Sequence, residues 1–458
     1  MSELLLYHLF LALGVVLTLF LVAQILRDRR PPAASLAWLL FILAMPYLAI
    51  PVYLVFGVRK VRYPDKKALY SGATHSSRGS RVPELDRLLD SYGLPPAVEG
   101  NGVIFHGDGS ESLAALWKVI DGAERFLDIA IFILGRDEVG RQVCKRLARR
   151  AGEGIRVRLL LDGVGSFLLP RRWVREMREH GVEVRWFVPV LHPPLKGRTN
   201  LRNHRKLVLA DGRRVWTGGR NLATEYFDSA GLRQRPWLDM SFDLEGPGVA
   251  GFQQVFEADW AFSGGGVAED PRPVAGTAGR ATVRLLPSGP DMPEDPLQAL
   301  LLAICFEARQ RILVVTPYFI PDEALAEGLG LAARRGVDVQ LLLPQASNHR
   351  MADIARNRYL RMLAETGVKI HLQPGVMNHA KMLVMDDRLA LCGSANLDPR
   401  SLYLNFEIVA LFHDQAEIRW LTHWAEEMKR CGRPHHPKRP GALRFMLESV
   451  VLLISFQL

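Results

Sequence analysis

The chain has 458 residues, of which 48% are hydrophobic, and a formal net charge of +10. This length allows two half-domains of roughly 170–180 residues, each with its own core. The four cysteines have no CxxC spacing and no paired spacing, which argues against a disulfide framework and for reduced thiols in a cytosol-facing protein. The basic charge suits anionic lipid and nucleic acid equally and excludes neither.

The N-terminal residues predict a membrane anchor, residues 1–60, with two spanning helices. Residues 4–26 carry no charge over 23 residues, and residues 33–57 form a second uncharged stretch of 25. Each stretch is long enough to cross a hydrocarbon core. Pro46 and Pro51 are expected to kink the second helix. A cleaved signal peptide is the alternative for the first stretch, but no Lys or Arg precedes it and no small-residue cleavage site follows.

Two spans would place the N-terminus and the large C-terminal part of the chain on one side of the membrane. Five basic residues at 59–67 outnumber three at 27–30, which favours a cytoplasmic location for that part, although the charges at 27–30 pull the other way. The basic residues at 59–67 are also expected to attract anionic lipid, each by about 1 kcal/mol. Residues 61–100, with Ser, Gly and Pro clusters, predict a linker.

Two similar segments follow, at 101–265 and 281–440, joined by a stretch rich in Gly and Pro. Short apolar runs recur in the same order in both: 126–134 parallels 312–320, 155–161 parallels 337–343, and 181–185 parallels 367–371. Strands alternating with helices predict an α/β fold whose buried sheets are covered by helices. Two such halves packed face to face would form an intramolecular pseudo-dimer.

A pattern with six specified positions, His-x-Lys-x4-Asp-x6-Gly-(Gly/Ser)-x-Asn, occurs once in each half. The first copy is His204, Lys206, Asp211, Gly218, Gly219 and Asn221, and the second is His379, Lys381, Asp386, Gly393, Ser394 and Asn396. A single match would most often be an ordinary core or surface histidine. Two matches in similar surroundings indicate a duplicated site.

These residue types suit phosphodiester exchange through a covalent intermediate. Imidazole attacks phosphorus when a carboxylate fixes its tautomer, and a second imidazole can protonate the leaving oxygen. The ammonium groups of Lys206 and Lys381 and the amides of Asn221 and Asn396 can donate to the non-bridging phosphate oxygens. Two lysine charges would do what Mg²⁺ does elsewhere, so we expect no metal and no other cofactor.

The chain resembles members of the phospholipase D superfamily and, among them, bacterial cardiolipin synthases. Besides the two signatures, the resemblance rests on segments at 46–57, 237–239, 316–322 and 405–407, and it covers nearly the whole chain. It implies two phospholipase D-like α/β half-domains preceded by two transmembrane helices.

The resemblance also implies roles for individual residues. By analogy, His204 forms a phosphohistidine, while His379 acts as general acid and then as general base; the reverse assignment stays open. Asp239 and Glu407 would orient the imidazoles. Asp211 and Asp386, counted with the catalytic signature, would hold the catalytic strand and its turn. Arg220 departs from the pattern and is either a contact for a lipid headgroup phosphate or a plain surface arginine.

The implied reaction joins two phosphatidylglycerol molecules into cardiolipin and glycerol, in a multi-pass protein of the bacterial inner membrane that binds anionic lipid and no nucleic acid. One alternative is phospholipase D-type hydrolysis of phospholipid or nucleic acid; two anchoring spans argue against a nuclease. The other is an inactive membrane-anchored lipid-binding protein, which two intact motifs disfavour. Residues 441–458 are apolar and predict either an interfacial helix or a helix packed on the protein.

Overall fold

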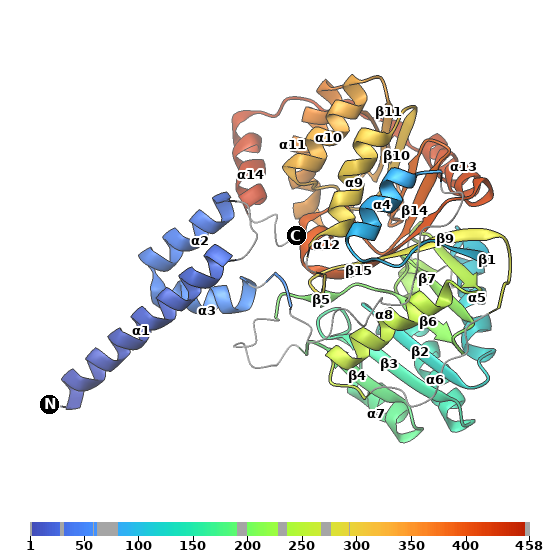
Figure 1. The fold of residues 1–458 in the computed structure, drawn as a ribbon, viewed down its shortest axis with the longest axis horizontal. Coiled ribbons are helices and arrows are strands. Elements are labelled where there is room, and N and C mark those ends of the chain that lie inside the picture. The colour runs from blue at the N-terminus through green and yellow to red at the C-terminus, as the bar shows by residue number, and fades with distance from the viewer. Residues whose placement is uncertain are drawn as a thin grey trace.

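The two halves carry matching elements in the same order (Figure 1). The computed structural model describes residues 2–27, 32–57, 59–61, 81–189, 199–227, 236–266, 276–292 and 294–453. The first half comprises β1 (Val98–His106), α5 (Gly109–Asp121), β2 (Phe126–Ile131), α6 (Glu138–Gly152), β3 (Arg156–Asp162), α7 (Arg171–Glu179), β4 (Glu183–Phe187), β5 (Arg202–Asn203), β6 (Leu207–Ala210), β7 (Arg214–Gly218), a 3-10 turn (Thr224–Tyr226), β8 (Ser241–Glu245) and α8 (Val249–Phe262).

The second half repeats this order and confirms the predicted α/β duplication. It comprises β9 (Ala281–Ser288), α9 (Pro296–Glu307), β10 (Arg311–Val315), α10 (Glu323–Arg334), β11 (Asp338–Pro344), α11 (Arg350–Glu365), β12 (Lys369–Gln373), β13 (Met382–Met385), β14 (Leu389–Gly393), α12 (Pro399–Tyr403), β15 (Asn405–Phe412), α13 (Gln415–Cys431) and β16 (Arg433–Pro434). The paired apolar runs of the sequence become β2 and β10, β3 and β11, and β4 and β12.

The halves are joined by strand pairing as well as by side-chain packing. We expected them to pack face to face, but their strands form one 16-stranded sheet, in which β9 pairs antiparallel with β1 on one side and with β15 on the other. One hydrophobic core also contains residues of both halves, including Phe256 on α8 and Ile418 on α13. The interface between the halves is therefore continuous in both sheet and core, and it fixes the position of one signature relative to the other.

Helices cover both faces of the sheet, which explains the apolar strand sequences. On β2, Ile129 packs in the core beneath α5, α6 and α7, whereas its neighbour Ala130 packs in the core shared by the two halves. Because successive side chains point to opposite faces and both faces are buried, these strands read as continuous hydrophobic runs.

Helix α4 (Pro83–Ser91) lies within the segment predicted as a linker. Leu85 and Leu89 are buried in the core of the second half. The guanidinium group of Arg284 lies 2.9 Å from the Asp86 carboxylate and 2.7 Å from that of Asp90. Apolar residues at helical spacing produce this amphipathic helix, so the linker prediction was wrong for this part of the segment.

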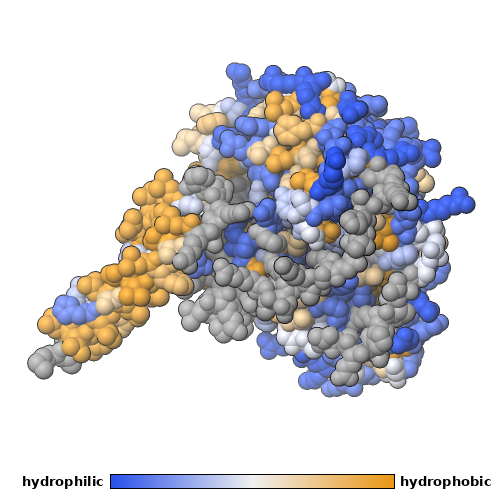
Figure 2. Space-filling model, in the orientation of Figure 1, coloured by the Kyte–Doolittle hydropathy of each residue, from blue (hydrophilic) through white to orange (hydrophobic). Residues whose placement is uncertain are grey.

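The N-terminal helices, within residues 2–56, form an apolar arm that projects from the two halves (Figures 1 and 2). Helix α1 (Ser2–Arg27) is the outer edge of this arm. Within the described residues, one helix is long and apolar enough to cross a membrane: its Leu4–Leu26 stretch has a mean hydropathy of 2.7. At 1.5 Å per residue it is about 35 Å long, which exceeds the thickness of a hydrocarbon core. The first predicted span is therefore consistent with the structure.

The second predicted span is two short helices, α2 (Pro32–Ala44) and α3 (Pro46–Phe56). They break at Met45, whose backbone is not helical, because a residue before proline is disfavoured in the helical region. The helices fold back on each other: Trp38 of α2 packs edge-on against Tyr53 of α3, with ring centroids 5.0 Å apart. We expected a kink within one helix and find a helical hairpin.

The first residues of the basic segment after α3 contact the protein. Lys60 Nζ lies 2.6 Å from an Asp295 oxygen, and the Arg59 guanidinium lies 4.7 Å from the centre of the Tyr403 ring. These two side chains tie the arm to the second half, so their predicted role in attracting lipid is not supported. The basic residues at 62–67 lie outside the described residues.

Helix α14 (Ala442–Leu453) packs against α11 near the C-terminus. The buried Glu448 carboxylate lies 2.5 Å from the Arg361 guanidinium, and Val451 is buried beside Ala355. Leu443 and Met446 remain exposed. Of the two alternatives for this segment, packing on the protein is therefore observed, and the helix also retains an exposed apolar surface.

Candidate active site

The two signatures meet at one cavity of about 380 Å³. Both histidines and both asparagines of the signatures line it: His204, Asn221, His379 and Asn396. Each histidine is bonded through its backbone to the opposite half, since His204 N donates to Phe406 O at 2.9 Å and His379 N donates to Leu238 O at 2.6 Å. Strand pairing between the halves thus brings the two imidazoles to the same cavity.

Each imidazole is also held by a carboxylate from the opposite half. His204 Nδ1 lies 3.0 Å from the carboxylate of Glu407, and His379 Nδ1 lies 2.7 Å from that of Asp239. A proton on Nδ1 shared with the carboxylate leaves Nε2 as the nitrogen available for a substrate. Ser394 donates its hydroxyl proton to Glu407 and fixes that carboxylate.

The two lysines lie behind the histidines and are fully buried. Lys206 Nζ donates to His204 O at 2.7 Å; Lys381 Nζ likewise donates to His379 O and lies 2.6 Å from His379 Nδ1. Burial lowers the pKa of Lys206 to about 7 and that of Lys381 to about 8. Because a bound phosphate favours the charged form of both amines, both lysines are suited to hold an anion.

The electrostatics of the site keep the imidazoles neutral and the carboxylates ionised. Burial and nearby Lys381 lower the pKa of His379 to about 3, and burial is also the main cause that lowers the pKa of His204. Burial raises the pKa of Asp239, but Lys381 and His379 outweigh it, and the net pKa is below its usual value. Burial also raises the pKa of Glu407, but the nearby His204 outweighs it, and the net pKa is again below its usual value. The positive charges of the two lysines therefore offset the negative charges of the two carboxylates. When an anionic substrate binds, one additional proton can be taken up on an imidazole.

The two signature asparagines differ in their surroundings. Asn221 Oδ1 accepts from Ile133 N at 3.2 Å, and its amide donates to the Tyr226 hydroxyl at 2.8 Å. Asn396 is buried at the cavity, and its backbone N–H donates to the Ser401 hydroxyl at 3.1 Å. Both asparagines line the same cavity as the imidazoles, and their contact with a phosphate stays a prediction.

Asp211 and Asp386 lie at the far ends of the signature strands, away from the cavity. The Asp211 carboxylate accepts from the backbone N–H groups of Glu124, Arg125 and Phe126 at 2.8–2.9 Å. Asp386 accepts in the same way from the N–H groups of Arg309, Gln310 and Arg311, at the start of β10. Both residues have positive φ, at 56° and 50°, in the turn that follows the strand. Their place fits the structural role that we predicted and gives them no contact with a substrate in the cavity.

We expect Asp211→Ala to lower the melting temperature by roughly 5–10 °C, which corresponds to about 2–4 kcal/mol. Three N–H groups lose a charged acceptor, and alanine must adopt a left-handed backbone. The specific activity of the folded protein should stay within about twofold. Thermal melting in detergent and activity per folded molecule check both points, with the exposed Asp387→Ala as control. Unchanged melting together with lost activity would contradict a structural role.

Arg220 contributes to the interior of the first half and is fully buried. Its guanidinium donates to His106 O at 2.7 Å, Gly107 O at 3.0 Å and Tyr226 O at 3.1 Å. Both alternatives considered for it, a headgroup contact and a surface arginine, were wrong. The five donors of arginine suit a site where several carbonyls converge.

Several residues that shape the cavity were not predicted from the sequence. Phe132 packs edge-on against His204 with ring centroids 4.8 Å apart, and Tyr226 packs against His379 at 5.1 Å. Arg202 and Arg400 bring two further cations to the lining. A single aromatic residue or arginine is not part of a spaced motif, so the sequence does not mark it as a lining residue. Arg400 is the exception, because it lies four residues after Asn396 of the second signature.

Comparison with known proteins decides the family. A family model described as "Cardiolipin synthase, PLD-like domain" matches residues 116–260 and 301–429, and one described as "Phospholipase_D-nuclease N-terminal" matches residues 16–57. This chain belongs to the phospholipase D-like cardiolipin synthase family. The predicted family and the predicted enzyme class, a phosphatidyltransferase, are thereby confirmed.

Relatives in this family match most of the chain. Cardiolipin synthase A of Pseudomonas fluorescens is 32% identical over 412 residues, which cover 86% of this chain and 86% of that protein. The cardiolipin synthase of Geobacillus kaustophilus is 31% identical over 460 residues, covering 95% of this chain and 91% of that protein. The phosphatidylserine synthase of Haemophilus influenzae superposes with a TM-score of 0.63 at 14% identity, over 82% of this chain and 100% of that chain, and so shares the fold.

Proposed function

We propose that this cardiolipin synthase family member transfers a phosphatidyl group from one phosphatidylglycerol to another, giving cardiolipin and glycerol through a phosphohistidine. The observation that carries the proposal is that two imidazoles, each paired with a carboxylate of the opposite half, line one cavity with two buried lysines behind them. One imidazole can attack while the other supplies a proton, as a two-step exchange requires.

In the first step, His204 Nε2 attacks the phosphorus of the donor lipid. A P–N bond forms, the P–O bond to glycerol breaks, and His379 gives its proton to the departing oxygen. Glu407 stabilises the imidazolium that develops on His204, while Lys206 and Lys381 stabilise the phosphate oxygens. His379 is neutral in the free site, and the negative charge of the bound phosphodiester raises its pKa so that it can carry the proton.

In the second step, His379 acts as a base toward the headgroup hydroxyl of a second phosphatidylglycerol. The hydroxyl oxygen attacks phosphorus, the P–N bond breaks, and the hydroxyl proton moves to His379 Nε2, which returns to the protonated state that it had with the donor bound. Asp239 holds the opposite ring nitrogen through both steps. Water in place of the second lipid would give phosphatidic acid, so the aromatic wall of Phe132 and Tyr226 favours lipid transfer by limiting water.

The test is turnover of phosphatidylglycerol as the sole lipid by the purified full-length protein in detergent, with a chelator present. Cardiolipin and free glycerol in equal amounts, resolved by mass spectrometry, are the expected products. Phosphatidic acid alone would identify a hydrolase instead.

We expect kcat/KM to fall as the pH rises above about 7–8. The pKa values of Lys206 and Lys381 are lowered to about 7 and about 8, and a lysine carries its charge only below its pKa. A bound phosphate raises both pKa values, so the alkaline fall of kcat should come at higher pH than that of kcat/KM. Rate profiles from about pH 5.5 to 9.5 check this; a kcat/KM that stays flat to the alkaline end would contradict it.

We also propose that α1 crosses the inner membrane once, while α2 and α3 enter and return on the side of the catalytic halves. A 13-residue helix is only about 20 Å long, too short to span. The hairpin turn lies near the middle of α1, where a Cβ on Gly14 would lie 4.0 Å from the Tyr47 ring. Met45 N donates to Phe41 O, and Met45 O accepts from Ala49 N, so the turn is compatible with a lipid interior.

This topology brings both basic clusters to one side of the membrane. The three basic residues at 27–30 and the five at 59–67 then no longer oppose each other, and together they favour a cytoplasmic location for the catalytic halves. The N-terminus would lie on the opposite, periplasmic side.

Cysteine labelling on intact cells distinguishes this topology from two spans. We expect a Ser2→Cys, Cys431→Ser double variant to react with an impermeant maleimide before lysis, because Ser2 begins α1 on the outer side. The parent protein, whose exposed Cys431 lies on the second half, should react only after the membrane is broken. Protection of both positions in intact cells would support two spans instead.

A further inference from the structure

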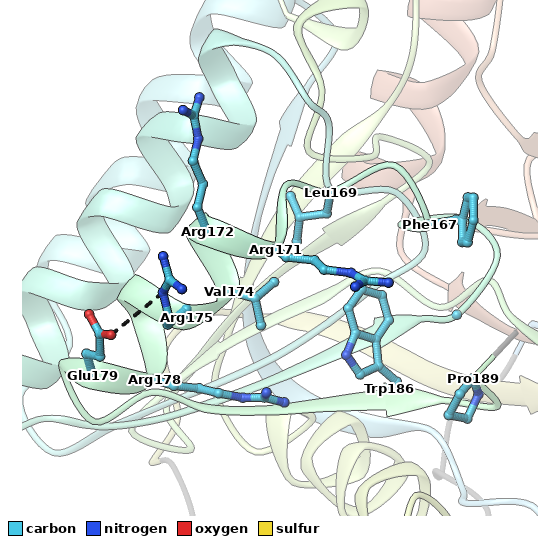
Figure 3. A pocket seen from close by; sticks show the side chains of 11 residues that line it. Phe167, Leu169, Arg171, Arg172, Val174, Arg175, Arg178, Glu179, Trp186 and Pro189 are labelled. Carbon is cyan, nitrogen blue, oxygen red and sulfur yellow. Dashed lines mark ion pairs between the residues drawn. The ribbon is translucent and has the colours of Figure 1, made fainter. Parts of the chain in front are cut away.

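A second and larger cavity lies in the first half, and Figure 3 shows the side chains that line it. Its volume is about 820 Å³, which is in the range of sites for ligands of substantial size. The loop between β3 and α7 separates the two cavities: Val164 lines the catalytic cavity, whereas Gly163 and Phe167 line the second. None of the steps described above uses this second cavity.

Helix α7 gives this cavity a strongly basic wall. Four of its arginines line the cavity: Arg171, Arg172, Arg175 and Arg178. Arg171 and Arg178 lie two turns apart, on the same face of the helix as Val174, and in Figure 3 both side chains extend toward Trp186. Glu179 is the one acidic residue of the lining, and it pairs with Arg175 at 3.8 Å. The wall therefore carries a net positive charge that an anion would balance.

The remainder of the lining is apolar, and its outer edge is exposed. Trp186 and Pro189 form one wall, and Leu169 lies at the end of the loop beside Arg171, apart from Phe167. Phe167 and its neighbour Leu168 are 64% and 71% exposed. Exposed apolar side chains beside arginines are typical of surfaces that contact both the acyl region and the headgroups of a bilayer.

We propose that this cavity binds one diacyl anionic phospholipid taken from the bilayer, separate from the lipid at the histidines. The headgroup phosphate accepts hydrogen bonds from Arg171 and Arg178, and an acyl chain lies along Trp186 and Phe167. A soluble phosphate compound would leave this apolar wall uncovered. The membrane span proposed for α1 would place the chain at a bilayer, where such a lipid is abundant.

The site would keep an anionic phospholipid next to the catalytic cavity, ready to enter as donor or acceptor. This supply role rests on the proposed phosphatidyl transfer, whereas binding itself does not. Binding and turnover can therefore be measured separately, and either can fail without the other.

Photolabelling in a bilayer tests the binding. The full-length protein is placed in phosphatidylcholine nanodiscs with a trace of phosphatidylglycerol that carries a diazirine on one acyl chain, and adducts are mapped by peptide mass spectrometry. We expect adducts within residues 163–189, reduced about fivefold or more in an Arg171→Gln, Arg178→Gln variant and largely kept when both arginines become lysine. The control is Arg87→Gln, Arg430→Gln, which removes the same charge from arginines that are 74% and 71% exposed.

Three results would overturn the proposal. The first is equal labelling of residues 163–189 in the double glutamine variant, provided that its melting temperature matches the parent. The second is equal labelling by a phosphatidylcholine with the same diazirine chain, which would indicate an apolar contact without charge recognition. The third is displacement by millimolar inorganic phosphate or by a single-stranded oligonucleotide, which would identify a site for soluble phosphate or for nucleic acid.

Discussion

Alanine at either His204 or His379 should lower kcat for cardiolipin formation by about 10⁴–10⁶-fold, because each imidazole has a role in both chemical steps. The double variant should be hardly slower than either single variant, since groups that act as a unit do not contribute additively. Lipid turnover by the purified variants, followed by mass spectrometry, provides the measurement.

The control for these variants is His413→Ala. His413 is buried like the two signature histidines but does not line the catalytic cavity. Its replacement should affect melting more than kcat. A loss of turnover in His413→Ala comparable to that in His204→Ala would mean that the assay reports misfolding rather than chemistry.

Replacing the carboxylates that cross between the halves should have the next largest effect. Asp239→Asn and Glu407→Gln each keep the size of the side chain but remove the charge that fixes the imidazole of the opposite half. We expect kcat to fall by about 10²–10⁴-fold in each, because the imidazole loses its tautomer preference and the support for its positive charge. KM should change little, since neither carboxylate is placed to contact the lipid.

Asp243→Asn is the matched control for this pair. Asp243 is a buried carboxylate on β8, close to Asp239 in the sequence, and it pairs with Arg214 at 2.5 Å away from the cavity. Loss of that pair should lower the melting temperature and leave kcat nearly unchanged. If Asp239→Asn behaved like Asp243→Asn, with stability reduced and kcat kept, the orienting role would be wrong.

The proposed catalytic residues can be picked out from the sequence because their chemistry requires fixed residue types at fixed spacing. A histidine before a buried strand, a lysine two residues on and an aspartate in the turn are local features, and their repetition in His379, Lys381 and Asp386 removes ambiguity. The pairing of Glu407 with His204 spans 203 residues. Spacing carries no information about such a contact, and the family resemblance implied only that Glu407 orients an imidazole, not which one.

The errors arose where packing decides the structure. Pro46 was visible in the sequence, but whether it kinks a helix or reverses it depends on contacts such as Trp38 with Tyr53. Arg220 looked like an additional surface charge because nothing in the sequence shows three carbonyl groups converging on it. Residues 171–179 carry four arginines without a motif, and the sequence does not show that Trp186 and the preceding loop enclose a cavity beside them.

The central claim, that His204 carries the phosphatidyl group, is tested most directly by trapping the intermediate in His379→Ala. A donor with a nitrophenol leaving group needs no proton from His379, so the first step should proceed and stop at the covalent stage. We predict one nitrophenolate released per chain and, after an alkaline quench, one phosphatidyl group on the peptide that contains His204. Release without an adduct, or an adduct on His379 in His204→Ala instead, would contradict this account.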